Sequence, residues 1–343
     1  MTAATLDTFA RPLKHLRVSV TDRCNLRCGY CMPEAEYAWL PRPDLLTFEE
    51  LVWLADRFAS LGVESVRLTG GEPLVRQGLS SLVQQLSARP WLRDLALTTN
   101  GVLLAEQARA LKDAGLKRLT VSLDTLVPSR FKALTRRDSH GAVLEGIHEA
   151  ARVGFPGGLK LDTVLLRGVN DGELVPLLDF AGLVNAELRF IEYMDVGGAT
   201  QWRREAVVSR AEVLERLTQA FGRLEPLPGR GAAPAERFRL PDGRTFGVIA
   251  STTQPFCGAC DRARVTADGT FFTCLYAATG LELKSALRRG DGAEALEALL
   301  RDRWTGRRDR GAEARLSLSA RGPLATTSQL KREPRLEMHT RGG

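Results

Sequence analysis

The strongest constraint on the fold is a repeated alternation of short apolar runs with amphipathic segments along the first two thirds of the chain. The apolar runs predict strands, and the helical spacing of apolar residues between them predicts helices. This alternation favours a parallel sheet with right-handed crossovers, which an open doubly wound sheet and a partial barrel both satisfy. The predicted strands are 16–20, 65–69, 95–99, 119–123, 159–166 and 187–193, and the predicted helices are 47–62, 80–88, 104–114, 142–153 and 173–181.

Polar or glycine-rich strings directly follow the first three predicted strands, and another closes the fourth. They are TDRCNLRCGYC at 21–31, TGGEP at 69–73, TTNG at 98–101 and SLD at 122–124. The carboxyl ends of parallel strands lie at one edge of the sheet, where α/β folds bind their ligands. The order of these strings therefore predicts one shared site.

The last third of the chain has a different pattern. Residues 209–220 are predicted to form a helix, and the Pro- and Gly-rich stretch 225–236 to form a surface linker. Asp-Gly pairs at 242–243 and 268–269 lie between strand-forming runs, which predicts two hairpins. This part of the chain is therefore expected to form a small α+β domain.

All six cysteines of the 343-residue chain fall into two groups of three. Their spacings are Cys24-x3-Cys28-x2-Cys31, here called the first triad, and Cys257-x2-Cys260-x13-Cys274, the second triad. The sequence has no apolar run that could span a membrane and no secretion signal at its start. We therefore expect a cytoplasmic protein with reduced thiols rather than a disulfide framework.

Three thiolates on one short loop suit an iron–sulfur cluster. A structural zinc site takes four nitrogen or sulfur ligands, and no histidine lies near the first triad. A cubane cluster normally takes four thiolates, so three leave one iron open to another ligand. Buried structural cysteine or a partial zinc site is the alternative for the first triad, and a zinc ribbon is the alternative for the second.

Basic residues point to an anionic ligand. Arg262 and Arg264 alternate beside the second triad, so both face one side of an extended strand. The guanidinium fork matches phosphate geometry, and the net charge of +7 suits anions in general. The alternative for Arg262 and Arg264 is a basic strand that faces solvent and binds no ligand. The chain has no G-x-x-x-x-G-K-[ST] string, so scattered basic residues would have to hold a triphosphate.

The motifs also carry a family resemblance. The first triad, with Tyr30 inside it and TGGEP after the next strand, resembles the signature of radical S-adenosylmethionine (SAM) enzymes. With RFIEYMDVG at 189–197, FCGACDRARVTADG at 256–269 and the terminal Gly-Gly, the chain resembles the GTP 3',8-cyclase family of molybdenum cofactor biosynthesis. The resemblance covers nearly the whole chain.

The resemblance implies a fold and a reaction. The fold is α/β, an incomplete (β/α)6 TIM-type barrel over 1–200, followed by a small C-terminal α+β domain over 201–343 with a second iron–sulfur cluster. A 5'-deoxyadenosyl radical would abstract the ribose 3'-hydrogen of GTP, and the 3'-carbon would attack guanine C8. Two alternatives are a two-cluster radical SAM enzyme that modifies a peptide and a zinc-ribbon module that binds nucleic acid.

The resemblance also implies ligands and partners. Each triad would bind one 4Fe-4S cluster. The implied SAM contacts are Tyr30, Gly71, Ser122 and Met194. The implied GTP contacts are Arg17, Arg67, Thr98, Lys160, Arg189, Arg262 and Arg264, and the implied catalytic tail is Gly342 and Gly343. Expected partners are a flavodoxin- or ferredoxin-like electron donor, the downstream cyclic pyranopterin monophosphate synthase and a second copy of the chain, with no nucleic acid and no membrane.

Overall fold

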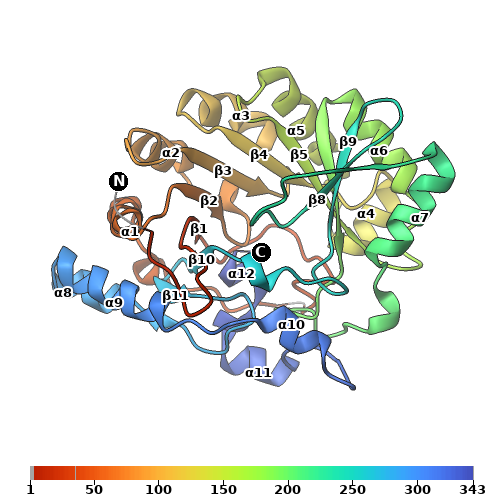
Figure 1. The fold of residues 1–343 in the computed structure, drawn as a ribbon. Helices are drawn as coiled ribbons and strands as arrows, with labels where there is room; N and C mark the ends of the chain where they lie inside the picture. The colour runs from red at the N-terminus through yellow and green to blue at the C-terminus, as the bar shows by residue number, and fades with distance from the viewer. Residues whose placement is uncertain (1–3, 35, 343) are drawn as a thin grey trace.

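Six parallel strands form the centre of the fold (Figure 1). The structure is a computed structural model that describes residues 4–34 and 36–342. Each of the six strands pairs with the next one along the chain. All six lie where the sequence predicts them, to within one residue at either end. They are β1 (His15–Ser19), β2 (Ser65–Thr69), β3 (Asp94–Thr99), β4 (Arg118–Ser122), β5 (Leu159–Leu165) and β6 (Ala186–Glu192).

Helices between these strands cover the outer face of the curved sheet (Figure 1). The predicted helices are confirmed, with bounds that differ by one or two residues at most ends. They are α1 (Phe48–Ser60), α2 (Leu79–Ser87), α3 (Leu104–Asp113), α5 (His140–Val153) and α6 (Leu174–Leu183). The short helix α4 (Pro128–Thr135) was not predicted, because its two turns are too short for a clear apolar period.

The start of α1 shows how the local sequence specifies an element. The Thr47 hydroxyl accepts from the Glu50 amide at 3.1 Å, and the Glu50 carboxylate accepts from the Thr47 amide at 2.7 Å. This reciprocal pair is a capping box, the motif that a Thr-x-x-Glu spacing at the start of a helix specifies. Leu51, Leu54 and Phe58 then follow at helical spacing and are buried against the sheet.

The strands of the C-terminal third extend the central sheet at both of its edges. On one side, β9 (Thr245–Ile249) pairs parallel with β6, followed outward by β8 (Glu236–Arg239) and β7 (Glu225–Leu227). On the other, β10 (Arg262–Val265) pairs parallel with β1. It is followed by β11 (Thr270–Phe272) and β12 (Leu281–Glu282). Over the described residues the result is a single 12-stranded sheet.

Both predicted Asp-Gly hairpins are present, as β8–β9 and β10–β11. The predicted surface linker 225–236 is partly wrong, because its first three residues form β7 and its last residue begins β8. Pro226 hides this strand in the sequence, yet an edge strand tolerates proline because one side of its backbone needs no partner.

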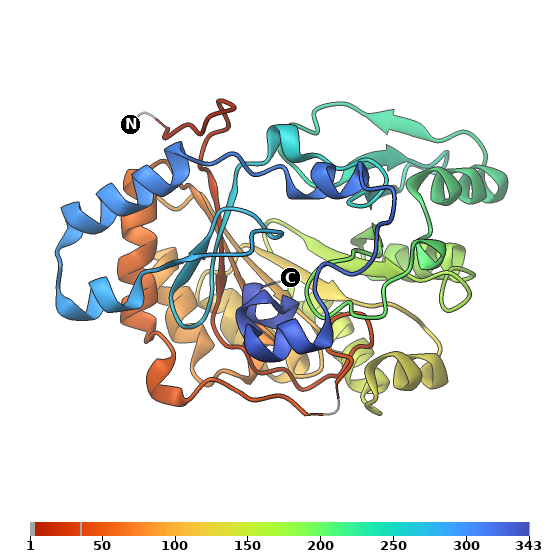
Figure 2. The same cartoon turned by 90° about the horizontal axis from the view of Figure 1, so that it is seen from below.

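The chain ends lie close to this sheet. Thr5 and Leu13 pair through their backbones, so the first described residues form a short loop before β1. The final helices lead the chain into the hollow of the sheet, where the C-terminus lies in both views (Figures 1 and 2). No helix of the described residues is long and apolar enough to cross a membrane. The later helices are α7 (Arg210–Phe221), α8 (Lys284–Arg289), α9 (Ala293–Thr305), α10 (Gly311–Leu316), α11 (Thr327–Arg332) and α12 (Met338–Arg341).

Close packing of α5 against α3 gives a first testable prediction. A Cβ atom on Gly146 would lie 2.5 Å from the Gly101 carbonyl oxygen, whereas one on Gly141, in the same helix, would meet nothing within 4 Å. We expect Gly146→Ala to lower the free energy of unfolding by about 1–3 kcal/mol through overpacking. Gly141→Ala is the matched control, and it should be neutral or stabilising by up to about 1 kcal/mol. Anaerobic urea unfolding measures both, and equal stabilities would contradict the close approach.

Candidate functional site

One cavity of about 850 Å³ lies in the hollow of the sheet, and all six cysteines line it. Residues from each polar string that follows a strand line it as well, among them Gly71, Asn100, Ser122 and Asp124. The prediction of one shared site at the carboxyl ends of the strands is therefore confirmed. Of the candidate SAM contacts, Tyr30, Gly71, Ser122 and Met194 all line this cavity.

The first triad sits on the loop after β1, and α4 holds this loop. The Arg27 amide donates to the Thr135 carbonyl at 2.9 Å, and the Gly29 amide donates to the Leu134 carbonyl at 3.0 Å. The element that the sequence analysis missed is therefore the one that supports this loop from outside. Phe131 and Thr135 of α4 also line the cavity.

The thiols of the first triad are free, with Cys28 buried and Cys24 and Cys31 partly exposed, and neutral donors face Cys24. The Leu26 amide and the Asn100 side chain donate to Cys24 Sγ at 3.5 and 3.9 Å. Burial raises the pKa of Cys24 to about 12. A hydrogen bond to Cys28, together with burial, raises the pKa of Cys31 well above its ordinary value. Such thiolates need a cation to be stable here, so the donor set fits an iron–sulfur cluster.

The TGGEP string packs directly on the loop of the first triad. The Gly71 amide donates to the Thr21 carbonyl at 2.9 Å, and the Glu72 amide donates to the Arg23 carbonyl at 2.7 Å. A Cβ on Gly71 would lie 2.4 Å from the Arg23 carbonyl oxygen. Glycine is therefore required here for contact between two loops, in addition to its expected approach to a ligand.

Two buried carboxylates that the sequence analysis did not assign support the same loops. Glu72 accepts hydrogen bonds from the Thr99 hydroxyl and from the Asn100 amide, both at 2.7 Å. Asp124 accepts from the Tyr30 hydroxyl at 2.7 Å. Burial raises the pKa of Glu72 to about 7 and the pKa of Asp124 to about 6. Glu72 lies in the string TGGEP and Asp124 in the string SLD. Their position at the end of a strand was the one sequence signal that could have identified them as site residues.

The raised pKa of Glu72 predicts a pH dependence of stability. Between its ordinary value of 4.5 and about 7, the folded protein binds more protons than the unfolded chain. The free energy of unfolding therefore falls as the pH rises through this window, by about 3 kcal/mol from this group. Glu72→Gln, which is neutral at every pH, should remove this fall. Thermal unfolding followed anaerobically by circular dichroism across the window tests it, and parallel pH profiles would contradict the assignment.

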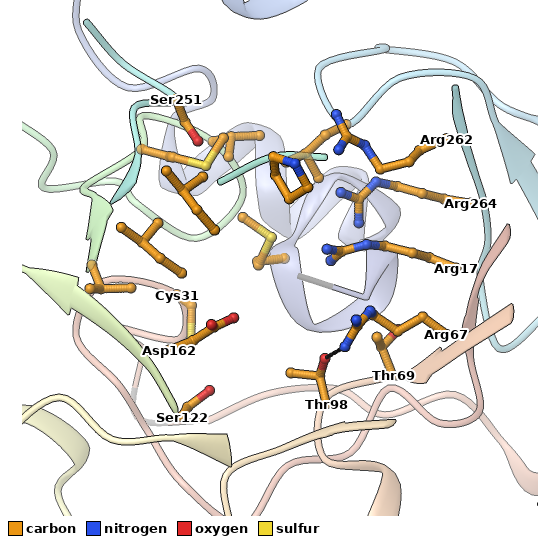
Figure 3. A pocket seen from close by; sticks show the side chains of 18 of the residues that line it. Arg17, Cys31, Arg67, Thr69, Thr98, Ser122, Asp162, Ser251, Arg262 and Arg264 are labelled. Atoms are coloured by element: carbon orange, nitrogen blue, oxygen red, sulfur yellow. Dashed lines mark hydrogen bonds between the residues drawn. The ribbon is translucent and has the colours of Figure 1, made fainter. Parts of the chain in front are cut away.

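A row of arginines forms one wall of the cavity. Arg17 of β1 is in register with Arg67 of β2 on one side and with Arg264 of β10 on the other. Figure 3 shows these guanidinium groups, with that of Arg262, stacked and pointing into the cavity. Arg67 also donates to the Thr98 hydroxyl at 2.9 Å.

The carboxylate of Asp162 also lines the cavity and offsets part of the repulsion between these like charges. Burial, with the charge of Arg264, lowers the pKa of Arg17 to about 9. Burial likewise lowers the pKa of Arg67 to about 9 and that of Arg264 to about 10. All three remain protonated at neutral pH, so the wall is a preformed site for a multiply charged anion.

Lys160 and Arg189 lie differently from this row. Arg189 lines the cavity and its Nε lies 3.1 Å from Glu187 Oε1. Lys160 Nζ lies 3.4 Å from the same carboxylate oxygen, and Lys160 is not among the described residues that line the cavity. Burial, with the charge of Arg189, lowers the pKa of Lys160 to about 8. Arg118, which the sequence analysis did not single out, does line the cavity.

The C-terminal tail reaches the arginine row. The Gly342 carbonyl accepts from Arg264 and, at 3.4 Å, from Arg17. Arg341 anchors the tail by donating to the Leu275 carbonyl at 2.6 Å. The predicted entry of the tail into the site is therefore seen for Gly342, whereas Gly343 lies outside the described residues.

The second triad lies across the loop before β10 and the turn after β11. Arg262 and Arg307 donate to Cys260 Sγ at 3.5 and 3.4 Å, and the Tyr276 amide donates to Cys274 Sγ at 3.4 Å. Burial raises the pKa of Cys260, but the charges of Arg262 and Arg307 outweigh it and lower that pKa to about 7. Three free thiols with N–H donors around their sulfurs fit a second cluster.

Among the described residues, no three His, Cys, Asp or Glu side chains converge on one point as the ligands of one metal ion do. A cubane distributes its thiolates over separate iron atoms and so has no such requirement.

Known proteins match nearly the whole chain. Residues 18–181 match the Radical SAM superfamily, and residues 186–313 match Molybdenum Cofactor Synthesis C. GTP 3',8-cyclase 3 of Mycobacterium bovis and GTP 3',8-cyclase 1 of Mycobacterium tuberculosis are each 54% identical, over 98% of this chain and 90% and 95% of their own lengths. GTP 3',8-cyclase of Aquifex aeolicus is 44% identical over 98% of this chain and 99% of its own length.

A solved structure supports the fold independently. SuiB of Streptococcus suis matches 90% of this chain and 68% of its own length, with a TM-score of 0.61 and 17% sequence identity. The same protein bound to S-adenosylmethionine matches with a TM-score of 0.60. At this identity the match concerns the fold alone.

Proposed function

The chain belongs to the GTP 3',8-cyclase family of the radical SAM superfamily, and from this membership we propose that it converts GTP to (8S)-3',8-cyclo-7,8-dihydroguanosine 5'-triphosphate. This is the first step of molybdenum cofactor biosynthesis. The observation that carries the proposal is a single cavity lined by two free cysteine triads and by a row of arginines. The first triad indicates SAM cleavage. The second triad and the arginines indicate binding of a purine triphosphate.

We propose two resident cofactors and two small-molecule ligands. Each triad would hold one 4Fe-4S cluster through its three cysteines, and the cluster at the first triad would have one iron without a cysteine, which SAM would bind. When bound, the first cluster supplies the electron that cleaves SAM and produces the 5'-deoxyadenosyl radical. Tyr30, Gly71, Ser122 and Met194 line the cavity in positions suited to SAM, which supports their assignment as its contacts.

The chain's own residues act by binding and orientation. Arg17, Arg67 and Arg264, with Arg262 next to them, present charge to the triphosphate, and Thr98 extends the row. Hydrogen abstraction by a carbon radical needs no acid or base, so the cavity serves to align the ribose and exclude water. Arg189 also lines the cavity and is a further candidate contact for the triphosphate. Lys160 does not line the cavity, so we propose that it acts on the ligand only indirectly, through its ion pair with Glu187.

The electron balance implies a partner. The product has the same composition as GTP, because the hydrogen lost from C3' is replaced by one gained at the reduced guanine. One electron cleaves SAM, and a second electron with a proton completes the dihydroguanine. We propose that a flavodoxin- or ferredoxin-like protein in the cytoplasm donates these electrons.

We propose that the chain forms a homodimer and passes its product to cyclic pyranopterin monophosphate synthase. We also propose a functional division of the chain. Residues 1–200 serve SAM, and residues 201–343 carry the second cluster and the tail.

Anaerobic reconstitution tests the proposal. Reconstituted protein should hold about eight irons per chain, as two cubanes require. With reductant, SAM and GTP, 5'-deoxyadenosine and the cyclised nucleotide should appear together. Formation of 5'-deoxyadenosine with intact GTP would reject this substrate and leave a peptide-modifying enzyme. Bound zinc without SAM cleavage would reject the enzyme.

The arginine row gives a binding prediction of its own. Arg264→Ala should raise the dissociation constant for GTP about 10- to 150-fold, because one charged hydrogen-bonding group contributes about 1.5–3 kcal/mol. Arg239→Ala is the matched control, since Arg239 is exposed on β8 and pairs with Glu225 at 2.9 Å. Equilibrium dialysis with reconstituted protein measures both constants. Equal affinities for Arg264→Ala and the control would exclude this wall as the triphosphate site.

A further inference from the structure

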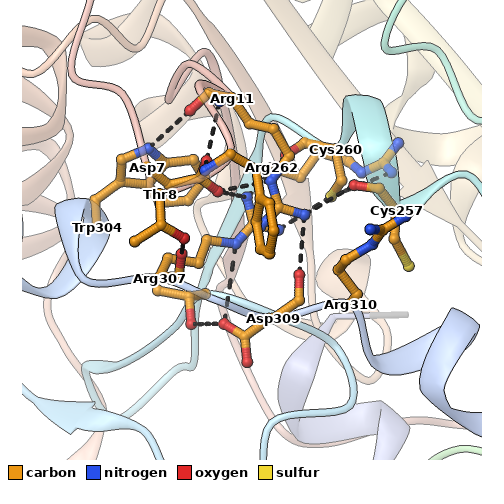
Figure 4. Close-up of polar contacts among 12 residues, drawn as sticks. Asp7, Thr8, Arg11, Cys257, Cys260, Arg262, Trp304, Arg307, Asp309 and Arg310 are labelled. Atoms are coloured by element: carbon orange, nitrogen blue, oxygen red, sulfur yellow. Dashed lines mark hydrogen bonds and ion pairs between the residues drawn. The ribbon is translucent and has the colours of Figure 1, made fainter.

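A network of charged side chains, with Arg11 and Arg307 buried in it, surrounds the Cys257–Cys260 loop of the second triad (Figure 4). Its members come from opposite ends of the chain. Asp7 and Arg11 belong to the loop before β1, and Arg307 follows α9. Arg11 and Arg307 are only 2% and 3% exposed. The reaction proposed above uses none of them.

Two guanidinium groups hold the two ends of the Cys257–Cys260 loop. Arg11 donates to the Cys257 carbonyl at 2.8 Å, and Arg307 donates to the Cys260 carbonyl at 2.8 Å. Asp7 lies between them, with Oδ2 at 2.6 Å from Arg11 Nε and at 3.4 Å from Arg307 Nη1. The shared carboxylate therefore fixes both arginines relative to each other.

Arg307 also reaches a sulfur atom. Its second terminal nitrogen donates to Cys260 Sγ at 3.4 Å, so its planar fork binds both the carbonyl and the thiol of one residue. The Trp304 ring lies 4.5 Å from the guanidinium carbon and closes off its other side. The Trp304 indole N–H in turn donates to the Arg11 carbonyl at 3.3 Å. The fork is thus held in one orientation by its neighbours.

The charges of this network do not balance within it. The two arginines face one fully buried carboxylate, Asp7, while Asp309 is 30% exposed at its side chain and lies 3.9 Å from Arg307 Nε. A buried cation is costly without a counter-charge. A cubane with three thiolates carries a net negative charge, which grows on reduction, and can provide that counter-charge.

The first triad has no equivalent. Among the described residues, the donors to Cys24 Sγ are the Leu26 amide and the Asn100 side chain, both neutral. Arg27 lies on the same loop but donates to the carbonyls of Cys24 and Leu26 rather than to a sulfur. Hydrogen bonds and nearby charges shift the reduction potential of an iron–sulfur cluster. The different surroundings of the two triads would therefore give two clusters of one type different reduction potentials.

We propose that Arg307 is a positioning residue that raises the reduction potential of the second cluster by donating a charged N–H···S hydrogen bond to Cys260, in an orientation fixed by Asp7. This inference rests on the second cluster of the proposed function. It assigns the network a redox role: the second cluster takes an electron more readily than the first, which must stay strongly reducing to cleave SAM.

Potentiometric titration of the reconstituted full-length enzyme, followed by electron paramagnetic resonance, tests this role. The signal of the second cluster is identified by its change on addition of GTP without SAM. Arg307→Gln should lower its midpoint potential by the equivalent of a tenfold change in the reduction equilibrium, about 59 mV for one electron. Arg307→Lys, which keeps the charge but loses the fork, should recover part of this shift. Arg308→Gln is the matched control, because Arg308 is exposed and adjacent in the chain.

A second variant separates electrostatics from folding. Asp7→Asn removes the negative charge but keeps a side-chain oxygen that can accept from Arg11 and Arg307, so the fork stays in place. The same potential should then move upward, opposite to Arg307→Gln. Shifts of the same sign in both variants, or no shift in Arg307→Gln at about eight irons per chain, would overturn the inference. About four irons in the unsubstituted protein would instead reject the second cluster itself, and with it the proposed function.

Discussion

Cys28→Ala is expected to abolish SAM cleavage, and Cys274→Ala is expected to abolish only the cyclisation of GTP. Each substitution removes one of three cluster ligands, so each should reduce the iron content from about eight to about four atoms per chain. Cys28→Ala leaves no cluster for SAM, and 5'-deoxyadenosine should fall to background. Cys274→Ala leaves the first cluster intact, so slow SAM cleavage should continue under strong reductant while the cyclised nucleotide disappears.

Glycines between the cysteines of each triad provide matched controls. A Cβ added at Gly29, between Cys28 and Cys31, or at Gly258, between Cys257 and Cys260, would meet nothing within 4 Å. Gly29→Ala and Gly258→Ala should therefore keep about eight irons and both products. Iron analysis and chromatography of the anaerobic reaction measure all four variants. Identical defects in Cys28→Ala and Cys274→Ala would contradict separate roles for the two triads.

Gly342→Ala is expected to reduce turnover at least about 100-fold while leaving iron content unchanged. Gly342 has a φ of +67°, and its added Cβ would lie 2.0 Å from Thr69 Oγ1 and 3.0 Å from Ser19 Oγ. The left-handed conformation costs a residue with a Cβ about 1–2 kcal/mol, and the clash moves the tail out of the site. Displacement of a catalytic segment by about 1 Å is enough for a loss of this size.

Gly322→Ala is the control for the tail, because its Cβ would meet nothing within 4 Å and Gly322 lies in the same C-terminal part of the chain. Rates of formation of the cyclised nucleotide, measured anaerobically at saturating GTP, compare the two variants. A rate for Gly342→Ala close to that of Gly322→Ala would show that the tail does not act where its Gly342 carbonyl meets Arg17 and Arg264.

Local sequence patterns were sufficient for the central part of the fold. The six parallel strands and five of their helices follow from apolar periodicity, and the start of α1 follows from its Thr47 and Glu50 capping pair. The location of the site followed from the polar strings at the ends of the first four strands, because strand order alone brings those strings to one edge. These features depend on residues close together in the chain.

Contacts between distant residues could not be read in this way. The two Asp-Gly hairpins were visible, but not that β9 would join β6 and β10 would join β1 in one sheet. Lys160 looked equivalent to the arginines in other strands, yet its side chain turns to Glu187. Neither α4 nor the buried acid Glu72 had a pattern strong enough to be assigned beforehand.

The sequence by itself determined the chemistry that this protein can support, because cysteine spacing and the motifs around it specify cluster ligands within single loops. Only the tertiary structure decided how that chemistry is arranged. The register of β1, β2 and β10 aligns three arginines into one wall, and the ends of the chain bring Asp7 and Arg307 to the second triad. Buried charges are stable only beside partners that distant segments supply, and folding is what brings those segments together.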